Sequence, residues 1–129
     1  MKVLVVDDSG PIRKIMGKML RRMGFEVLEA CHGKEALVQL EKHPDIELLT
    51  VDWNMPEMNG IELLEAMKTK RGSKPKPTIV MVSTENEKGK IVRAMSKGAN
   101  EYIMKPFTEE ILTEKLRFLG MGGSKNDKR

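Results

Sequence analysis

The chain is poor in the residues that build several common kinds of site. Among its 129 residues it has one cysteine, Cys31, and two histidines, His32 and His43. One cysteine cannot form a disulfide framework, and neither a C-x-x-C pair nor a histidine cluster is present, which argues against the usual zinc sites. We expect Cys31 to be a small core or edge residue and both histidines to lie in turns.

Long apolar runs and phosphate-loop signatures are also absent. No stretch approaches the roughly 20 apolar residues that span a bilayer, and the short apolar run after Lys2 meets two aspartates at once, unlike a secretory signal. We therefore expect a cytoplasmic protein that makes no membrane contact. The chain lacks a Walker-type loop and a G-x-G-x-x-G motif, and Ser9-Gly10 lacks the context of a hydrolase nucleophile, so nucleotide binding and serine hydrolysis find no support.

The basic balance of the chain does not indicate nucleic-acid binding. The formal net charge is +4, and half of it comes from residues 120–129, which we expect to form a disordered basic tail. Other basic residues flank a Gly/Pro-punctuated loop between Lys68 and Lys76. No aromatic residues interleave with them and no arginine stripe follows one helix, so we interpret this region as a solvated loop.

Apolar runs and helical stripes alternate five times along the chain. The apolar runs predict strands at Lys2–Val6, Phe25–Ala30, Asp45–Val51, Thr78–Val82 and Glu101–Met104. The stripes predict helices at Pro11–Met23, Gly33–Lys42, Ile61–Lys70, Glu87–Lys97 and Thr108–Leu119. We expect Ile15 in the first helix and Val92 and Met95 in the fourth to face inward. This alternation is typical of right-handed βαβ units, and thus of one α/β domain over residues 1–119 with a parallel sheet.

Polar residues follow four of these predicted strands directly. They are Asp7-Asp8, Asp52, Ser83 and Lys105. The carboxyl ends of parallel strands share one edge, where open α/β sheets bind ligands, so these side chains should converge. Carboxylates held together repel one another unless a cation sits among them, and Mg²⁺ prefers oxygen ligands. The set therefore suits a divalent metal and a phosphoryl group.

Asp52 stands alone after its strand and is suited to attack phosphorus, forming an aspartyl phosphate. Such a transfer needs preorganised groups that neutralise the phosphoryl charge. Lys105 can reach one phosphoryl oxygen, and Ser83 can donate a hydrogen bond to another. Lys105 precedes Pro106, so the peptide bond between them is a candidate for the cis form.

Four stretches of the chain carry a resemblance to a known family. They are VVDD (5–8), DWNMPEMNG (52–60), MVSTE (81–85) and YIMKPFT (102–108). In this order and spacing the chain resembles response-regulator receiver domains over residues 1–119, and among them the stand-alone chemotaxis members. The resemblance implies a flavodoxin-like (βα)5 fold: a doubly wound, five-stranded parallel sheet in the order 2-1-3-4-5 within a single domain.

The resemblance also implies how the acidic residues act. Asp52 would accept the phosphoryl group. Asp8 would ligate Mg²⁺ directly and Asp7 mainly through water, with Asp52 and the backbone carbonyl of Asn54 completing the metal site. Asn54 and Glu85 occupy positions that tune autodephosphorylation in the family.

The remaining roles concern switching. Ser83 would be the switch hydroxyl, standing where close chemotaxis relatives carry threonine, and Lys105 the ammonium that senses the phosphate. Tyr102 would turn inward when Ser83 moves toward the phosphoryl group; the alternative is an aromatic residue that only packs on the fourth helix.

A single-domain response regulator of a two-component system is the function that this resemblance implies. The chain would not be an ordinary enzyme, since it would only take a phosphoryl group from a histidine kinase or a small phosphodonor and lose it again. Phosphorylation would bias the face built by the fourth helix, fifth strand and fifth helix toward a partner. We expect a monomer.

Three functions stay open at this point. The first is chemotaxis, with a CheA-type histidine kinase upstream and a flagellar motor switch protein as target. The second is a phosphorelay shuttle that passes phosphate to a histidine phosphotransfer domain. The third is a phosphatase of the haloacid dehalogenase type, which adjacent rather than spaced acids after the first strand disfavour.

Overall fold

A computed structural model of the chain describes residues 1–71, 76–85 and 87–121. Strands and helices alternate along it. The strands are β1 (Lys2–Val6), β2 (Glu26–Ala30), β3 (Ile46–Val51), β4 (Thr78–Ser83) and β5 (Glu101–Met104). The helices are α1 (Gly10–Arg22), α2 (Gly33–Lys42), α3 (Gly60–Arg71), α4 (Lys88–Ser96) and α5 (Glu109–Phe118). Every element lies within one residue of its predicted bounds.

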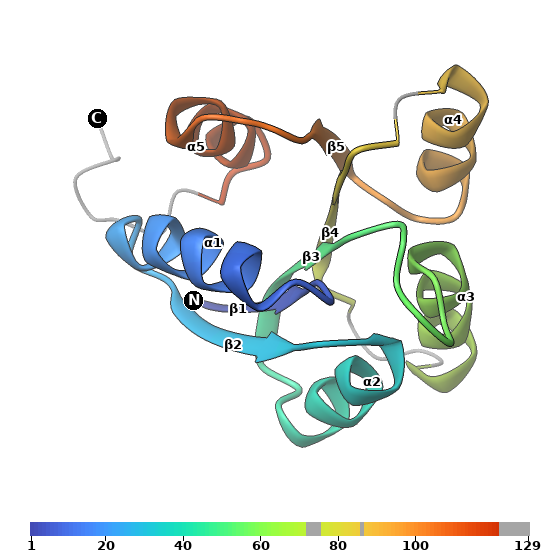
Figure 1. Cartoon of the computed structure of the whole chain (residues 1–129). Helices are drawn as coiled ribbons and strands as arrows, with labels where there is room; N and C mark the ends of the chain where they lie inside the picture. The colour runs from blue at the N-terminus through green and yellow to red at the C-terminus, as the bar shows by residue number, and fades with distance from the viewer. Residues whose placement is uncertain (72–75, 86, 122–129) are drawn as a thin grey trace.

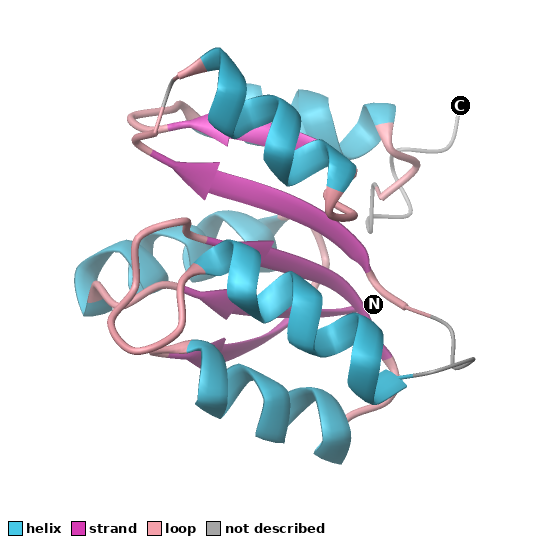
Figure 2. Ribbon diagram, turned by 90° about the vertical axis from the view of Figure 1, so that its right-hand side faces the viewer, coloured by secondary structure: helices cyan, strands magenta, loops and turns pink. Residues whose placement is uncertain are grey.

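The five strands form one parallel sheet in the order β2-β1-β3-β4-β5. This confirms the predicted fold class and strand order. Because all strands run the same way, as the arrows in Figure 2 show, their carboxyl ends lie at one edge of the sheet. The order departs from the chain sequence between β1 and β3, and the crevice of a doubly wound sheet opens at such a point.

The sheet is buried on both faces. Alternating residues of β1 belong to different core clusters: Val3 and Val5 pack with α1 and α5, whereas Leu4 and Val6 pack with α2, α3 and α4. Figure 1 shows the same division of the helices between the two faces. Burial on both faces explains why the strands appear in the sequence as nearly continuous apolar runs.

Side chains at the strand-to-helix turns cap four of the helices, including α3, where Asn59 Oδ1 accepts from the Glu62 N–H, 2.8 Å. Ser9 Oγ accepts a hydrogen bond from the Ile12 N–H, 3.3 Å, at the start of α1. His32 Nδ1 accepts from Glu35 N–H, 3.1 Å, at α2, and Thr108 caps α5 in the same way. These caps fix where each helix begins after the loops at the carboxyl edge of the sheet.

Three side chains expected inside are exposed. Ile15 of α1 is 50% exposed, and Val92 and Met95 of α4 are 65% and 41% exposed, so the prediction that they face inward was wrong. On α4 the buried residue is Ala94, with Ile91 packed against the same cluster. The inward-facing part of α4 thus includes Ala94 and Ile91, while Val92 and Met95 turn outward.

Two further features bear on the predictions. Met121 is buried in the cluster formed with α1 and α5, so packing extends past the predicted domain boundary at 119. The rest of the expected tail, 122–129, lies outside the described residues. Within the described part of the chain, no helix is long and apolar enough to cross a membrane.

Candidate functional site

Backbone hydrogen bonds carry the sheet one residue beyond its strands, and they position the site residues. The Asp7 N–H donates to the Ala30 carbonyl, 3.1 Å, and the Asp52 N–H donates to the Val6 carbonyl, 3.0 Å. The Lys105 N–H likewise donates to the carbonyl of Ser83, 2.9 Å. The predicted convergence at the carboxyl edge therefore follows from strand pairing alone.

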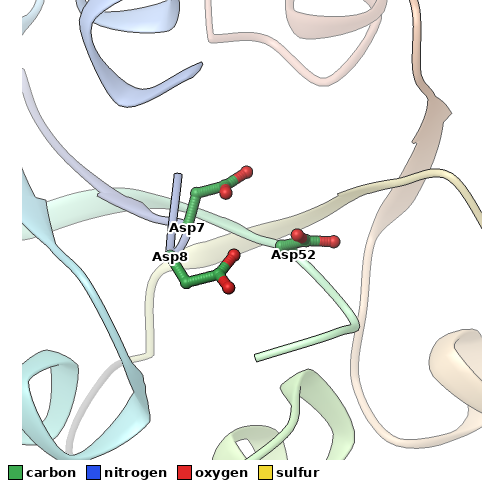
Figure 3. Close-up of side chains that lie close together, drawn as sticks. All are labelled: Asp7, Asp8 and Asp52. Atoms are coloured by element: carbon green, nitrogen blue, oxygen red, sulfur yellow. The ribbon is translucent and has the colours of Figure 1, made fainter. Parts of the chain in front are cut away.

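Asp7, Asp8 and Asp52 form a compact acidic cluster. One carboxylate oxygen from each lies within 4.8 Å of the others, and Figure 3 shows the three side chains side by side. Asp7 and Asp52 are buried, whereas Asp8 is exposed. Three clustered carboxylates are a hard oxygen donor set that repels itself when empty, so the residues fit a divalent cation such as Mg²⁺.

Lys105 reaches into this cluster from the end of β5. Its Nζ lies 2.8 Å from Asp7 Oδ2 and 3.4 Å from Asp52 Oδ2, and its side chain is 15% exposed. Burial disfavours the ammonium, but hydrogen bonding to Asp7 and the charges of both carboxylates raise the pKa of Lys105 overall. The Lys105–Pro106 peptide bond is cis.

The Asp52 carboxyl is held in an environment of opposing influences. Burial raises its pKa, the positive charge of Lys105 lowers it, and the negative charge of Asp7 raises it again, leaving the pKa above its usual value. Ionisation of Asp52 therefore costs more free energy in the folded protein than in the unfolded chain. A bound cation would lower this cost, because it stabilises the ionised carboxylate.

Asp7 is restrained more than the sequence indicates. Its Oδ1 accepts a hydrogen bond from Ser9 N–H, 2.9 Å, while its Oδ2 faces Lys105. Arg13 on α1 donates to the carbonyl of Asp7, 2.7 Å, and pairs with Glu29 on β2, 2.9 Å. The sequence analysis missed Arg13, because no spacing rule links a helix residue to the backbone of the preceding loop.

Ser83 and Tyr102 meet at the loop between β4 and α4. Ser83 is fully buried, and its Oγ accepts a hydrogen bond from the Glu85 N–H, 3.3 Å. The Tyr102 hydroxyl donates to the Glu85 carbonyl, 2.7 Å, and its side chain is buried in the core cluster that also contains Ala94 of α4. Tyr102 thus occupies an inward position and does pack near α4, so both readings of this residue retain support.

Glu85 links the two sides of the site. Its carboxylate accepts a hydrogen bond from the side chain of Asn54, 3.0 Å, and pairs with Lys90 of α4, 3.0 Å. These partners lower the pKa of Glu85, Asn54 having the larger effect. The Lys90 ammonium also lies 5.7 Å from the centre of the Trp53 ring. Lys90 was missed as well, since its pairing depends on how α4 is placed against the β3–α3 loop.

The loop after Asp52 is shaped by a close backbone approach. A Cβ on Gly60 would lie 2.6 Å from the Asp52 carbonyl oxygen and 2.9 Å from Met81 Cε. Gly60 N–H instead donates to the Trp53 carbonyl, 2.9 Å. Glycine is required because the first turn of α3 is pressed against the segment that carries Asp52.

Comparisons with known proteins agree with this architecture. Residues 3–117 match the family described as response regulator receiver domain. The chain is 48% identical over 124 residues to a "Chemotaxis protein CheY homolog" of Campylobacter jejuni subsp. jejuni, covering 95% of each chain. It is 47% identical over 117 residues to "Chemotaxis protein CheY1" of Helicobacter pylori, covering 90% of this chain and 94% of the relative.

A solved structure shows the same fold. The structure of Vibrio cholerae chemotaxis protein CheY4 is 35% identical and superposes with a TM-score of 0.82, covering 91% of this chain and 96% of the other. The similarity therefore extends over most of both chains.

Proposed function

This chain belongs to the response regulator receiver domain family, and we propose that it is a phosphorylation-activated response regulator in which Asp52 accepts the phosphoryl group. The observation that carries the proposal is the placement of Asp52. It is buried at the carboxyl edge of the sheet, beside two further carboxylates and within 3.4 Å of the partly buried ammonium of Lys105. Family membership also removes the ground for the phosphatase alternative.

The carboxylates divide into two groups by their contacts. Both oxygens of Asp7 already face donors, Ser9 N–H and the Lys105 ammonium, which favours an indirect role for Asp7 through water. We propose that Asp8, Asp52 and the backbone carbonyl of Asn54 would hold Mg²⁺ directly. Bound there, the ion would supply positive charge against the oxygens of the transferring phosphoryl group.

The chain's own residues supply the rest of the chemistry. An oxygen of Asp52 forms the new bond to phosphorus as the bond to the donor's leaving group breaks. Lys105 would exchange its contact with the Asp52 carboxylate for one with a phosphoryl oxygen. The Ser83 hydroxyl accepts from a backbone N–H, and its hydrogen bonding lowers the pKa of Asp52 against the larger effect of burial, so it lies where it could donate to another phosphoryl oxygen.

Switching would pass through Glu85. Its N–H donates to Ser83 and its carbonyl accepts from the Tyr102 hydroxyl. A movement of Ser83 toward the phosphoryl group would therefore displace the Glu85 backbone and change the hydrogen bond that holds the Tyr102 side chain. We propose that phosphorylation shifts the population of the β4–α4 loop and Tyr102. The shift extends only as far as the two states differ in their contacts with the phosphoryl group.

The output surface we propose is the face of α4, β5 and α5. Its exposed large apolar side chains are Val92, Met95, Met104, Ile111 and Phe118. If these side chains form one contiguous patch, it would suit the binding of a protein partner. This feature favours a regulator that binds a target over a shuttle that only passes phosphate onward.

The partners we propose follow from the named relatives, which are chemotaxis proteins. A histidine kinase of the chemotaxis type would supply the phosphoryl group, and a flagellar motor switch protein would be the target. The protein would act in the cytoplasm as a monomer. A phosphorelay role with a histidine phosphotransfer domain is the second candidate.

Intact mass after incubation with acetyl phosphate tests the acceptor. We expect one added phosphoryl group in the wild type with Mg²⁺, none without it, and none in Asp52→Asn. Asp8→Asn should raise the Mg²⁺ concentration needed for phosphorylation. Addition of phosphate to Asp52→Asn at the wild-type level would refute the acceptor assignment, and no addition to any protein would leave a binding module without the chemistry.

A pulldown separates the two outputs. A motor-switch peptide captured only by the phosphorylated protein would support the binding role. Rapid loss of phosphate to a purified phosphotransfer domain, without peptide capture, would instead support the shuttle. Val92→Ser, which changes an exposed apolar side chain of α4, should weaken peptide capture while leaving phosphorylation intact.

A further inference from the structure

A chain of polar contacts runs from the acidic cluster to the start of α4. Asn54 follows Asp52 by two residues, and its side chain donates to Glu85. Glu85 in turn pairs with Lys90, whose ammonium lies over the ring of Trp53. This series of contacts begins and ends in the β3–α3 loop. The side chains that make it therefore form a ring near Asp52.

Glu85 is fixed at every polar group it has. Its N–H, its carbonyl and both carboxylate oxygens each have a partner, namely Ser83, Tyr102, Asn54 and Lys90. Its side chain is 23% exposed, and that of Lys90 is 39% exposed. A carboxylate that is both held and partly open to solvent forms part of the rim of the site.

Lys90 supplies the only cation among these four partners of Glu85. The acidic cluster already carries three carboxylates against the single ammonium of Lys105. An unpaired Glu85 would add negative charge at the rim, where an anionic phosphodonor must approach. Charges at the mouth of a site change the local concentration of a charged reactant and its rate of arrival.

Lys90 also joins α4 to the loop that precedes it. The N-cap residue of α4, Glu87, makes no side-chain hydrogen bond to the helix. The contact between Lys90 and Glu85 is therefore a side-chain link that ties the first turn of α4 back to the β4–α4 loop. The same contact that neutralises Glu85 also determines where it lies.

We propose that Lys90 is a positioning residue for phosphoryl transfer: it neutralises Glu85 and holds it against Asn54, so that small anionic phosphodonors meet a rim without excess negative charge. The inference rests on the proposed role of Asp52 as acceptor. It concerns the approach of the donor and does not place Lys90 in contact with phosphorus.

The test is the rate of phosphorylation by acetyl phosphate, followed through Trp53, the single tryptophan of the chain, and by intact mass. At low salt we expect Lys90→Gln to lower the apparent second-order rate constant roughly three- to tenfold. The defect should shrink to less than about twofold near 0.5 M salt, where the screening length is a few ångströms. Lys90→Arg should restore most of the rate.

Lys88→Gln is the matched control. Lys88 is exposed on the same helix, so this variant removes the same charge without touching Glu85, and its rate should stay near that of the wild type. If Lys90 acts through Glu85, then Lys90→Gln made in a Glu85→Gln background should cause a much smaller loss. Circular dichroism should show that all variants keep the fold.

The outcomes are distinct. A phosphorylated wild type with an unaffected Lys90→Gln would overturn this inference and leave the proposed function standing. A loss of equal size in the Glu85→Gln background, or in Lys88→Gln, would also overturn it, because the effect would then be one of general charge. A wild type that takes up no phosphoryl group overturns both the inference and the proposed function.

Discussion

Replacement of Lys105 by methionine should strongly destabilise the protein when no metal is added. The side chain is 15% exposed and lies 2.8 Å from an oxygen of Asp7 and 3.4 Å from one of Asp52. At an effective dielectric constant of about 20, these separations correspond to attractions of about 6 and about 5 kcal/mol. Methionine keeps an unbranched apolar side chain, one heavy atom shorter than that of lysine, and removes the charge.

The net effect is smaller than the sum of these attractions. Each of the three ions loses several kcal/mol of hydration on burial, which offsets most of the gain. Breaking a buried ion pair by removing one partner nevertheless costs about 3 to 5 kcal/mol, because the remaining charges stay buried and uncompensated. We therefore expect Lys105→Met to lower the free energy of unfolding by about 3 kcal/mol and the melting temperature by roughly 10 °C.

Urea unfolding at pH 7 in the presence of a chelator measures this loss. Lys88→Met, on an exposed site, is the control and should change stability by less than about 0.5 kcal/mol. Added Mg²⁺ should restore part of the stability of Lys105→Met, since binding to the folded state alone stabilises it. A loss below about 1 kcal/mol in chelator, or no response to Mg²⁺, would refute the view that Lys105 holds the acidic cluster together.

Three further changes test other parts of the structure. Asp52→Asn should stabilise the metal-free protein at pH 7, because Lys105 keeps Asp7 as its partner while a charge that burial disfavours is removed. Because burial raises the pKa of Asp52 above its usual 3.8, the wild type loses stability as pH rises from 3.8 through the folded-state pKa, so this gain should vanish in acid; a gain that persisted below 3.8 would contradict it. Thr50→Val should stabilise by about 1 kcal/mol in thermal unfolding, because the Thr50 hydroxyl is buried without a hydrogen-bond partner among the described residues; a destabilised variant would mean that the hydroxyl is satisfied. Gly60→Ala should destabilise by about 2 kcal/mol and slow phosphorylation, since its Cβ would meet the Asp52 carbonyl oxygen at 2.6 Å; a neutral result in both assays would show that the loop yields easily.

The order of the elements and the site at the sheet edge were predictable because both depend on local signals. Strands buried on both faces produce short apolar runs, and Lys2–Val6 is one of them. A residue that directly follows such a run must lie at the carboxyl edge when the strands are parallel. Asp52 and Lys105 are therefore brought together by topology, although 53 residues separate them.

The orientation of α4 could not be predicted from its stripe. Ile91, Val92, Ala94 and Met95 all fit a helical period, but only part of that stripe contacts the sheet. Which residues turn inward depends on how the helix is rotated and placed against the sheet, and here Ala94 is the residue that becomes fully buried. The exposed Val92 and Met95 are thus a result of packing, and they create the apolar face that we propose as the output surface.

By itself, the sequence determined the α/β fold, the family resemblance and the residues of the acidic cluster, because periodicity, strand ends and motif spacing are all local along the chain. Only the tertiary structure decided how the polar groups pair. It placed Lys105 between Asp7 and Asp52, turned Tyr102 onto the Glu85 carbonyl, and brought Lys90 to the rim. Such pairings depend on the directions of side chains on separate loops and helices. Patterns along the sequence do not give the distances between these side chains, so the pairings could not be predicted from it.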